Sequence, residues 1–158
     1  MDTEVINQLR GTFRGAIVEP GDADYDEIRA LYNAMIDKRP CLIAQCVDNA
    51  DVVTAIQFGR DQRLPVALRG CGHNGPGLAS CDDGLMIDLS GMKGVYVDPD
   101  SATVRVQPGC TQGDVDHATH AYGLAVPAGI VSTTGISGLT LGGGHGYLSR
   151  LHGLTVDN

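Results

Sequence analysis

The sequence has no long apolar run, little positive charge and no paired cysteine motif, and each absence excludes a class of protein. No stretch approaches the roughly 18 consecutive apolar residues of a membrane-spanning helix. Residues 1–13 mix polar and apolar side chains without the apolar centre of a secretory signal, so we expect no such signal. The GxxxxGK[ST] pattern of P-loop nucleotide hydrolases is also absent.

The shortage of basic residues leaves the chain of 158 residues with a formal net charge of −8 at pH 7. Nucleic acid and anionic membrane surfaces would be repelled by this charge, so we expect neither as a partner. An anionic ligand would have to be held locally, by backbone N–H groups, against an unfavourable overall field.

The five cysteines are odd in number and contain no CxxC pair. This pattern predicts neither a disulfide framework nor a structural zinc site, and it favours a reducing compartment, the cytoplasm. Cys41, Cys46 and Cys110 are predicted to be buried packing residues.

The first half of the chain has the pattern of alternating helix and strand. Apolar residues at helical spacing predict a helix over residues 22–37, closed by Pro40. A short buried strand over 41–46 is then followed by a helix over 50–58, with Asn49 as N-cap and Gly59 as its stop, and by a strand over 65–68. This order predicts a parallel pair of strands joined by a right-handed crossover.

The second half is rich in glycine, since most of the 22 glycines lie from Gly70 onward. We predict a strand over 85–89 and an antiparallel hairpin of 94–97 and 103–107 around the turn 98–101. A helix over 111–122 should begin with the capping pair Thr111 and Asp114 and end at Gly123, whereas 127–146 should form ordered loops and 154–158 should enter another strand.

The strongest candidate site is the run Arg69-Gly70-Cys71-Gly72-His73-Asn74-Gly75, directly after a predicted strand. Small residues let a backbone close tightly around an anionic group with its N–H groups pointing inward. His73 would then be held at a fixed distance from the ligand. The alternative is that His73 is a solvent-exposed loop residue.

The glycines of this run formally match the dinucleotide fingerprint GxGxxG, with Asp88 placed as a ribose-binding acid. A Rossmann turn must open a helix, however, and residues 75–84 are too interrupted by Gly and Pro to be helical. The sequence therefore argues against that fold.

His117 and His120, with Asp116 beside them, could offer metal ligands on one helix face. No third ligand lies within reach in the sequence, so a solvated helix face is the favoured interpretation and we predict no metal site.

Five motifs in order resemble the FAD-binding module of the vanillyl-alcohol oxidase and para-cresol methylhydroxylase (PCMH-type) family, nearest to its berberine-bridge-enzyme-like FAD-linked oxidases. The resemblance covers about residues 40–158. The motifs are Arg69-Gly70-Cys71-Gly72-His73-Asn74, Asp88-Leu89-Ser90-Gly91-Met92, Val106-Gln107-Pro108-Gly109-Cys110-Thr111, Gly123-Leu124-Ala125-Val126-Pro127-Ala128-Gly129 and Gly135-Ile136-Ser137-Gly138-Leu139-Thr140-Leu141-Gly142-Gly143-Gly144-His145-Gly146.

The resemblance implies an α+β PCMH-type fold: a small parallel βαβ subdomain, then a mostly antiparallel sheet with flanking helices, truncated at its C-terminus. Residues 1–39 would form a helical lead-in and residues 40–158 an incomplete FAD-binding domain without the substrate domain. Because family members are much longer, the chain would be a fragment, a truncated reading frame or a piece that needs a partner. An exposed sheet edge would then favour self-association into a homo-oligomer.

The resemblance also implies the cofactor, FAD, and its site residues. His73 matches the histidine that in many members is bonded to the flavin 8α-methyl carbon, and Val131 replaces a second attachment cysteine found in some members, so a single bond is implied. The loop around the pyrophosphate would comprise Arg69, Gly70, Cys71, Gly72 and Asn74; the loop along the flavin and ribityl chain would comprise Gly135, Gly138, Leu141, Gly142, Gly143, Gly144, His145 and Gly146.

Three residues depart from the usual family pattern: Cys71 replaces glycine, Asn74 replaces serine and His145 replaces tyrosine. The implied activity is that of an oxidase-like FAD-linked oxidoreductase, in which a small-molecule substrate passes a hydride to flavin N5. No catalytic base is identified. The alternative is a non-catalytic flavin-binding fragment or remnant; binding of another small molecule by the same loops has no residue in its favour.

Overall fold

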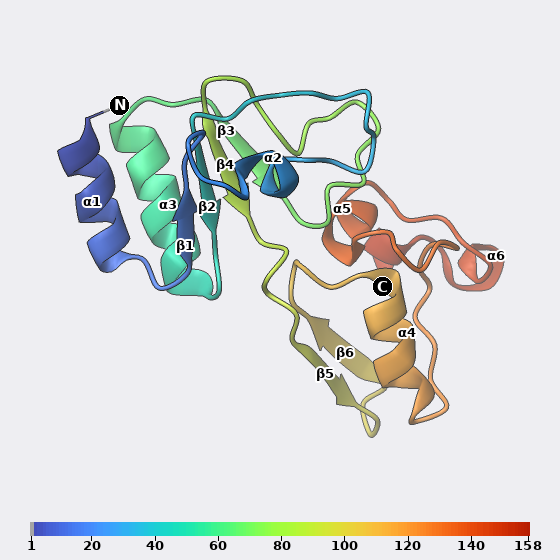
Figure 1. Cartoon of the computed structure of the whole chain (residues 1–158). Helices are drawn as coiled ribbons and strands as arrows, with labels where there is room; N and C mark the ends of the chain where they lie inside the picture. The colour runs from blue at the N-terminus through green and yellow to red at the C-terminus, as the bar shows by residue number, and fades with distance from the viewer. Residues whose placement is uncertain (1) are drawn as a thin grey trace. The chain divides into compact units, whose positions relative to one another are not determined.

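A computed structural model describes residues 2–158, which form two compact units, residues 2–91 (unit 1) and Met92–Asn158 (unit 2). Figure 1 shows the elements of each unit. The predicted domain boundary after residue 39 stays a prediction. Unit 1 contains α1 (Thr3–Thr12), β1 (Ala16–Val18), α2 (Tyr25–Ile28), β2 (Leu42–Gln45), α3 (Asn49–Asp61), β3 (Val66–Arg69) and β4 (Leu85–Asp88).

Unit 1 is built on a mixed sheet with the strand order β1-β2-β4-β3. Strands β2 and β3 both run parallel to β4, and β1 pairs antiparallel with β2. The predicted strands over residues 41–46, 65–68 and 85–89 are confirmed as β2, β3 and β4. The predicted direct pairing of β2 with β3 is wrong, because β4 lies between them. Every residue of β4 is buried, and its apolar run Leu85-Met86-Ile87 favours the central position, where neighbouring strands cover both of its edges.

Helices cover both faces of this sheet (Figure 1). Tyr25 of α2 packs with Ile43 and Met86 on one face. Gly59 of α3 lies against Val66 and Leu85 on the other, because neighbouring residues of a strand point to opposite faces. The edge strand β3 is only partly covered, and Val66 and Leu68 are about half exposed. Self-association through a sheet edge stays a prediction.

Helix α3 begins one residue earlier than predicted and continues past Gly59 to Asp61. Its N-cap is Asp48, whose carboxylate accepts hydrogen bonds from the backbone N–H groups of Ala50 and Asp51, so Asn49 is not the cap. Gly59 is not the stop: a Cβ there would lie 2.9 Å from Val66 Cγ2, so the glycine lets the helix approach the sheet closely.

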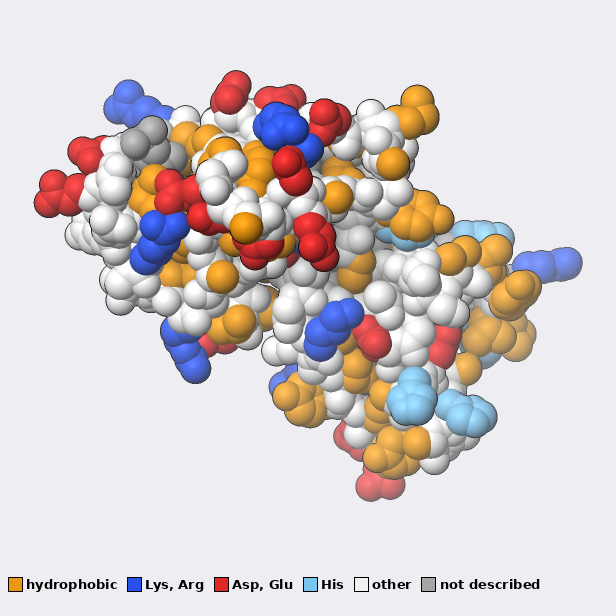
Figure 2. Space-filling view, viewed as in Figure 1, with side chains coloured by type: hydrophobic (Ala, Val, Ile, Leu, Met, Phe, Trp, Pro, Cys, Tyr) orange, Lys and Arg blue, Asp and Glu red, His pale blue; other side chains and the backbone are white. Residues whose placement is uncertain are grey.

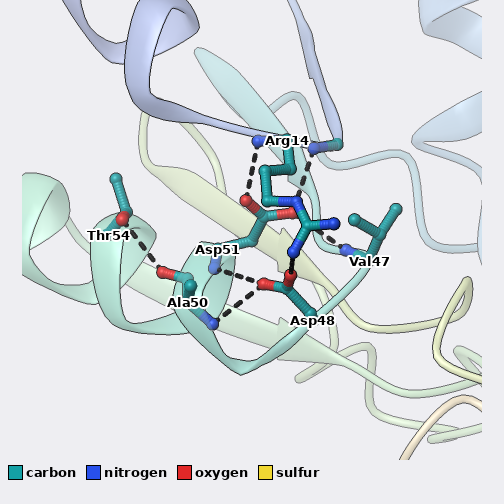
Figure 3. Close-up of polar contacts among 7 residues, drawn as sticks. Arg14, Val47, Asp48, Ala50, Asp51 and Thr54 are labelled. Carbon is teal, nitrogen blue, oxygen red and sulfur yellow. Dashed lines mark hydrogen bonds and ion pairs between the residues drawn. The ribbon is translucent and has the colours of Figure 1, made fainter.

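Asp51 ties the first turn of α3 to the chain before β1 and after β2 (Figure 3). Its carboxylate accepts hydrogen bonds from the backbone N–H groups of Arg14 (2.8 Å), Gly15 (3.0 Å) and Val47 (3.1 Å), and the residue is 1% exposed. The Arg14 guanidinium forms an ion pair with Asp48 beside it. One buried carboxylate thus satisfies donors from two separate segments.

The predicted helix over residues 22–37 is wrong, because only the four residues of α2, Tyr25–Ile28, are helical. The carbonyls of Ile28 and Ala30 accept hydrogen bonds from the Arg69 side chain at the end of β3. Tyr32 N donates to the carbonyl of Gly72 in the loop that follows. Long-range partners for these backbone groups override the helical pattern of apolar residues.

A buried ion pair joins the carboxyl ends of β3 and β4. Arg69 and Asp88 are neighbours in the parallel register, with Nε 3.0 Å from Oδ1 and Nη2 2.5 Å from Oδ2. Burial acts to raise the pKa of Asp88, but the hydrogen bonds and charge of Arg69, with hydrogen bonds from Ser90, outweigh it and hold this pKa below its usual value. Asp88 therefore stays ionised beside Arg69.

Unit 2 has its own small core, made by Cys110, Val115, Ala128 and Ile136. The predicted hairpin is confirmed as antiparallel, and so is the capping box of Thr111 and Asp114 at α4. The elements of unit 2 are β5 (Val95–Asp98), β6 (Thr103–Val106), α4 (Gln112–His120), α5 (Ile136–Leu141), α6 (Ser149–His152) and a 3-10 helix, η1 (Thr155–Asp157).

Two predictions for unit 2 are corrected. The stretch 127–146 contains the short helix α5 in addition to loops, with Gly135 as its N-cap. The end of the chain forms the 3-10 helix η1 instead of entering a strand, because Thr155 N and Val156 N donate to the carbonyls of Gly144 and Gly143.

The predicted packing role of Cys46 and Cys110 is confirmed, since both are buried, whereas Cys41 is half-buried. Burial, with the nearby charges of Asp51, Asp88 and Asp48, raises the pKa of Cys46 to about 12. None of the helices within residues 2–158 is long and apolar enough to cross a membrane. Figure 2 shows acidic side chains gathered on the visible face of unit 1, consistent with the net charge of −8.

Replacing Asp51 tests the contribution of its carboxylate to stability. Asp51→Ala should lower the free energy of unfolding by about 3 kcal/mol, because three buried N–H groups lose their acceptor. Urea unfolding measures the change, with Asp61→Ala at the exposed end of α3 as the control, expected within about 0.5 kcal/mol of the unmodified chain. Equal losses in the two variants would contradict this assignment.

Acid unfolding tests the Arg69–Asp88 pair. Because the folded-state pKa of Asp88 lies below 3.8, its share of stability is nearly complete above about pH 5 and is lost as the pH falls through the folded-state value. Arg69→Met should cost about 3 to 5 kcal/mol at neutral pH. Burial would then raise the pKa of Asp88, so the variant should lose less further stability during acidification. If the free energy of unfolding fell with pH in parallel for the unmodified chain and for Arg69→Met, Arg69 would not be the group that holds Asp88 ionised.

Candidate functional site

The glycine-rich loop after β3 is held by the non-helical segment that follows α2. Tyr32 N donates to the carbonyl of Gly72 (3.2 Å), and Asn33 Nδ2 donates to that of Gly75 (2.9 Å). Lys38 Nζ donates to the carbonyls of Gly77 (2.9 Å) and Ser80 (3.0 Å). These hydrogen bonds fix the backbone carbonyl groups of the loop over most of its length.

Two glycines in this loop have backbone conformations that other residues rarely adopt. Gly72 has φ +67° and Gly77 has φ +75°. A Cβ on Gly77 would lie 2.6 Å from Ile36 Cγ2, and one on Gly72 would lie 3.3 Å from Leu31 Cδ2. Residues 70–84 contain no helix, in agreement with the argument against a Rossmann turn.

The other predicted residues of this loop are placed as follows. Arg69 is committed to Asp88 and to the carbonyls of Ile28 and Ala30, so its guanidinium supports the start of the loop. Asn74 Oδ1 accepts from Leu78 N (2.9 Å), which closes the following turn. Gly70 and Cys71 are half-buried.

His73 lies in the middle of this loop, and its ring stacks on that of Tyr32 with centroids 4.1 Å apart and planes 17° apart. The Nε2 atom of His73 is buried and has no hydrogen-bond partner among residues 2–158. A buried nitrogen without a partner costs free energy, so this atom is a candidate for contact with a ligand. The interpretation of His73 as a freely solvated loop residue does not fit this burial.

The second predicted loop lies in unit 2, around α5. Gly143 (φ +108°) and Gly144 (φ +71°) follow the helix. A Cβ on Gly144 would lie 2.2 Å from Thr155 Oγ1, and one on Gly146 would lie 1.8 Å from the carbonyl oxygen of Ala128. Only glycine fits these positions, because the backbone meets the neighbouring chain there.

The remaining predicted residues of the second loop differ in exposure. Gly135 is buried at the N-cap of α5, whereas Gly138, Leu141, Gly142 and His145 are exposed. Gly138 has open space around it, since a Cβ there would meet nothing within 4 Å. This side of α5 is therefore free to take a ligand.

Sequence reasoning missed two features of the site region. Tyr32 was assigned to the apolar face of a helix, and no local signal pairs it with His73. Gln112 is 4% exposed, its Oε1 atom has no partner within residues 2–158, and it lines a cavity of about 180 Å³ in unit 2 with Asp116, Gly129 and Tyr147. No group of three or more metal-ligating side chains is found in the described part of the chain.

The residues present fit FAD. The first loop, in unit 1, combines glycines of positive φ with a buried imidazole nitrogen that lacks a partner among residues 2–158. The second loop, in unit 2, has glycines of positive φ of its own. Each loop has the glycine-rich backbone that can present N–H groups to a phosphate.

Comparisons with known proteins agree with this geometry. The family model described as an FAD binding domain matches residues 40–158. An FAD-linked oxidoreductase of Dictyostelium discoideum is 40% identical over 157 residues, covering 99% of this chain and 34% of that protein. The (R)-6-hydroxynicotine oxidase of Paenarthrobacter nicotinovorans is 32% identical over 147 residues, covering 93% of this chain and 32% of that protein.

Solved structures show the same fold. The structure of 6-hydroxy-D-nicotine oxidase from Arthrobacter nicotinovorans has a TM-score of 0.90 and 32% identity, covering 92% of this chain and 32% of that one. The berberine-bridge-enzyme-like protein 1 of Physcomitrella patens has a TM-score of 0.89 and 28% identity, covering 98% and 34%. The chain therefore spans about a third of the length of the relatives it matches. It belongs to the FAD-binding-domain family and has the PCMH-type, berberine-bridge-enzyme-like fold.

Proposed function

We propose that this chain is the cofactor-holding part of an FAD-linked oxidoreductase of the oxidase type, acting on a small molecule. The observation that carries the proposal is the buried, unpartnered Nε2 atom of His73 inside a loop that only glycine can form. Membership of the FAD-binding-domain family supports the cofactor. Because the chain covers about a third of its relatives, the activity of the whole protein is part of the proposal.

The backbone of both loops would bind the cofactor, and two basic side chains support the first loop. The glycine-rich backbone around Gly72 would present N–H groups to the cofactor's pyrophosphate. The backbone around Gly143 and Gly144 would lie along the flavin and ribityl chain. Arg69 and Lys38 hold the first loop in shape through buried and half-buried hydrogen bonds. When bound, FAD supplies a two-electron acceptor for substrate oxidation.

We further propose that the flavin is bonded covalently to His73 and to no other residue of the chain. Forming the bond removes the ring proton of His73 and one hydrogen of the flavin 8α-methyl group with two electrons, which dioxygen takes up as hydrogen peroxide. The supporting observation is that no group of the described chain occupies His73 Nε2. Val131 has no nucleophile with which to form a second bond.

The alternative is a flavin-binding module without turnover of its own. Anaerobic reduction of the bound flavin by a substrate would separate the two functions. A cytoplasmic location also belongs to the proposal, supported by five cysteines without a CxxC pair, and cell fractionation tests it.

Removing His73 tests the covalent bond. The chain produced with FAD should keep its yellow colour after acid precipitation and washing, whereas His73→Ala should release the flavin into the supernatant. His117→Ala, on the exposed face of α4, is the control and should retain the flavin. Acid-stable flavin on the His73→Ala chain would contradict the assignment.

Replacing Gly72 tests the first loop as a cofactor cradle. Gly72 and Gly123 share φ +67°, so alanine at either position carries the same backbone strain of about 1 to 2 kcal/mol. Gly72→Ala should weaken FAD binding by about tenfold or more, because the loop must also shift away from Leu31. Gly123→Ala, with open space around it, should change the affinity by less than about twofold. Flavin titration in a His73→Ala background, where binding is reversible, measures both; equal weakening would argue against the cradle.

A further inference from the structure

Within residues 2–91, Tyr32 makes the one aromatic ring contact of His73. The rings are 4.1 Å apart and nearly parallel at 17°, so the phenol covers one face of the imidazole. Stacked aromatic pairs of this kind restrain ring orientation and contribute modestly to stability.

The position of Tyr32 depends on the glycine loop. Its side chain is 67% exposed, so little of it is packed in the core. Its backbone N donates to the carbonyl of Gly72, the residue directly before His73, and the neighbouring Asn33 donates to the carbonyl of Gly75. The tyrosine and the histidine are therefore fixed to each other through the loop backbone.

Stacking restrains the imidazole without using its nitrogen atoms. A carboxylate or carbonyl partner would orient a histidine by accepting a hydrogen bond from the ring, as in many catalytic sites. His73 has no such partner at Nε2, which is buried and unpartnered. Tyr32 thus restrains the imidazole of His73 through one ring face, and Nε2 stays available for bonding.

We propose that Tyr32 is a positioning residue that holds the imidazole of His73 in the orientation from which it bonds to the flavin. This inference rests on the proposed covalent function of His73. Tyr32 itself forms no bond and transfers no proton; losing its ring should slow attachment while leaving reversible FAD binding to the glycine loops intact.

The rate of covalent attachment tests this role. FAD is added to the flavin-free chain in air, and acid-stable flavin is followed over time by in-gel fluorescence. Tyr32→Ala and Tyr32→Leu should slow attachment by about tenfold, because the ring is no longer held in line. Tyr32→Phe keeps the flat ring and should stay within about twofold of the unmodified chain.

Tyr122→Ala, an exposed tyrosine outside both loops, is the matched control and should attach flavin at the normal rate. The FAD dissociation constant of the Tyr32 variants, measured with His73 also replaced by alanine, should change by less than about twofold. In the flavin-free chain, the ring-proton resonances of His73 should be shifted upfield by the tyrosine ring and should lose that shift in Tyr32→Ala.

The failures are distinguishable. Normal attachment rates in Tyr32→Ala and Tyr32→Leu would overturn the role of Tyr32 while leaving the bond at His73 intact. A chain that never acquires acid-stable flavin would overturn the bond itself, and with it this inference. An unshifted His73 resonance in the flavin-free chain would overturn the stacking on which the proposal depends.

Discussion

The buried pair of Arg69 and Asp88 is the constraint from which the rest of unit 1 follows. It lies where two parallel strands end, and the glycine-rich loop begins at the next residue. The third nitrogen of the guanidinium donates to carbonyls of Ile28 and Ala30, so the same side chain fixes the segment that lies along the loop. A buried ion pair contributes little net stability, but it specifies one arrangement of the groups it joins. Here it specifies where the loop starts and which segment supports it.

Local signals in the sequence were sufficient for most strands and for helix α4. Strand β4 was predicted from its apolar run, the hairpin from its turn residues, and α4 from the capping pair of Thr111 and Asp114. The strand order was not predictable in this way, since β2 and β3 could have paired with each other on local evidence. The false helix over 22–37 has the same origin: its apolar spacing was correct, but its backbone bonds to residues about 40 positions away.

The site was predictable in its backbone and unpredictable in its side-chain contacts. Runs of glycine mark places where a chain needs unusual φ values or close approach, and Gly72, Gly143 and Gly144 have positive φ as such runs imply. No comparable sequence pattern identifies Tyr32 or Gln112. Stacking on a ring that is far away in the sequence, or lining a cavity, does not affect the local spacing of residue types. The ion pair of Arg69 with Asp88 is likewise not evident from local sequence, because the two residues meet only through the parallel register of β3 and β4.

The strand order of unit 1 also bears on how the chain folds as it is synthesised. Both β2 and β3 find their parallel partner only in β4, so neither can enter a parallel ladder until Asp88 has left the ribosome. Until then Leu42, Ile43 and Ala44 lack their parallel neighbour and can pair only with β1, while α3 is already able to form beside them. The nascent chain therefore exposes apolar strand surface for the time needed to translate the glycine loop, the interval in which a chaperone would act on it.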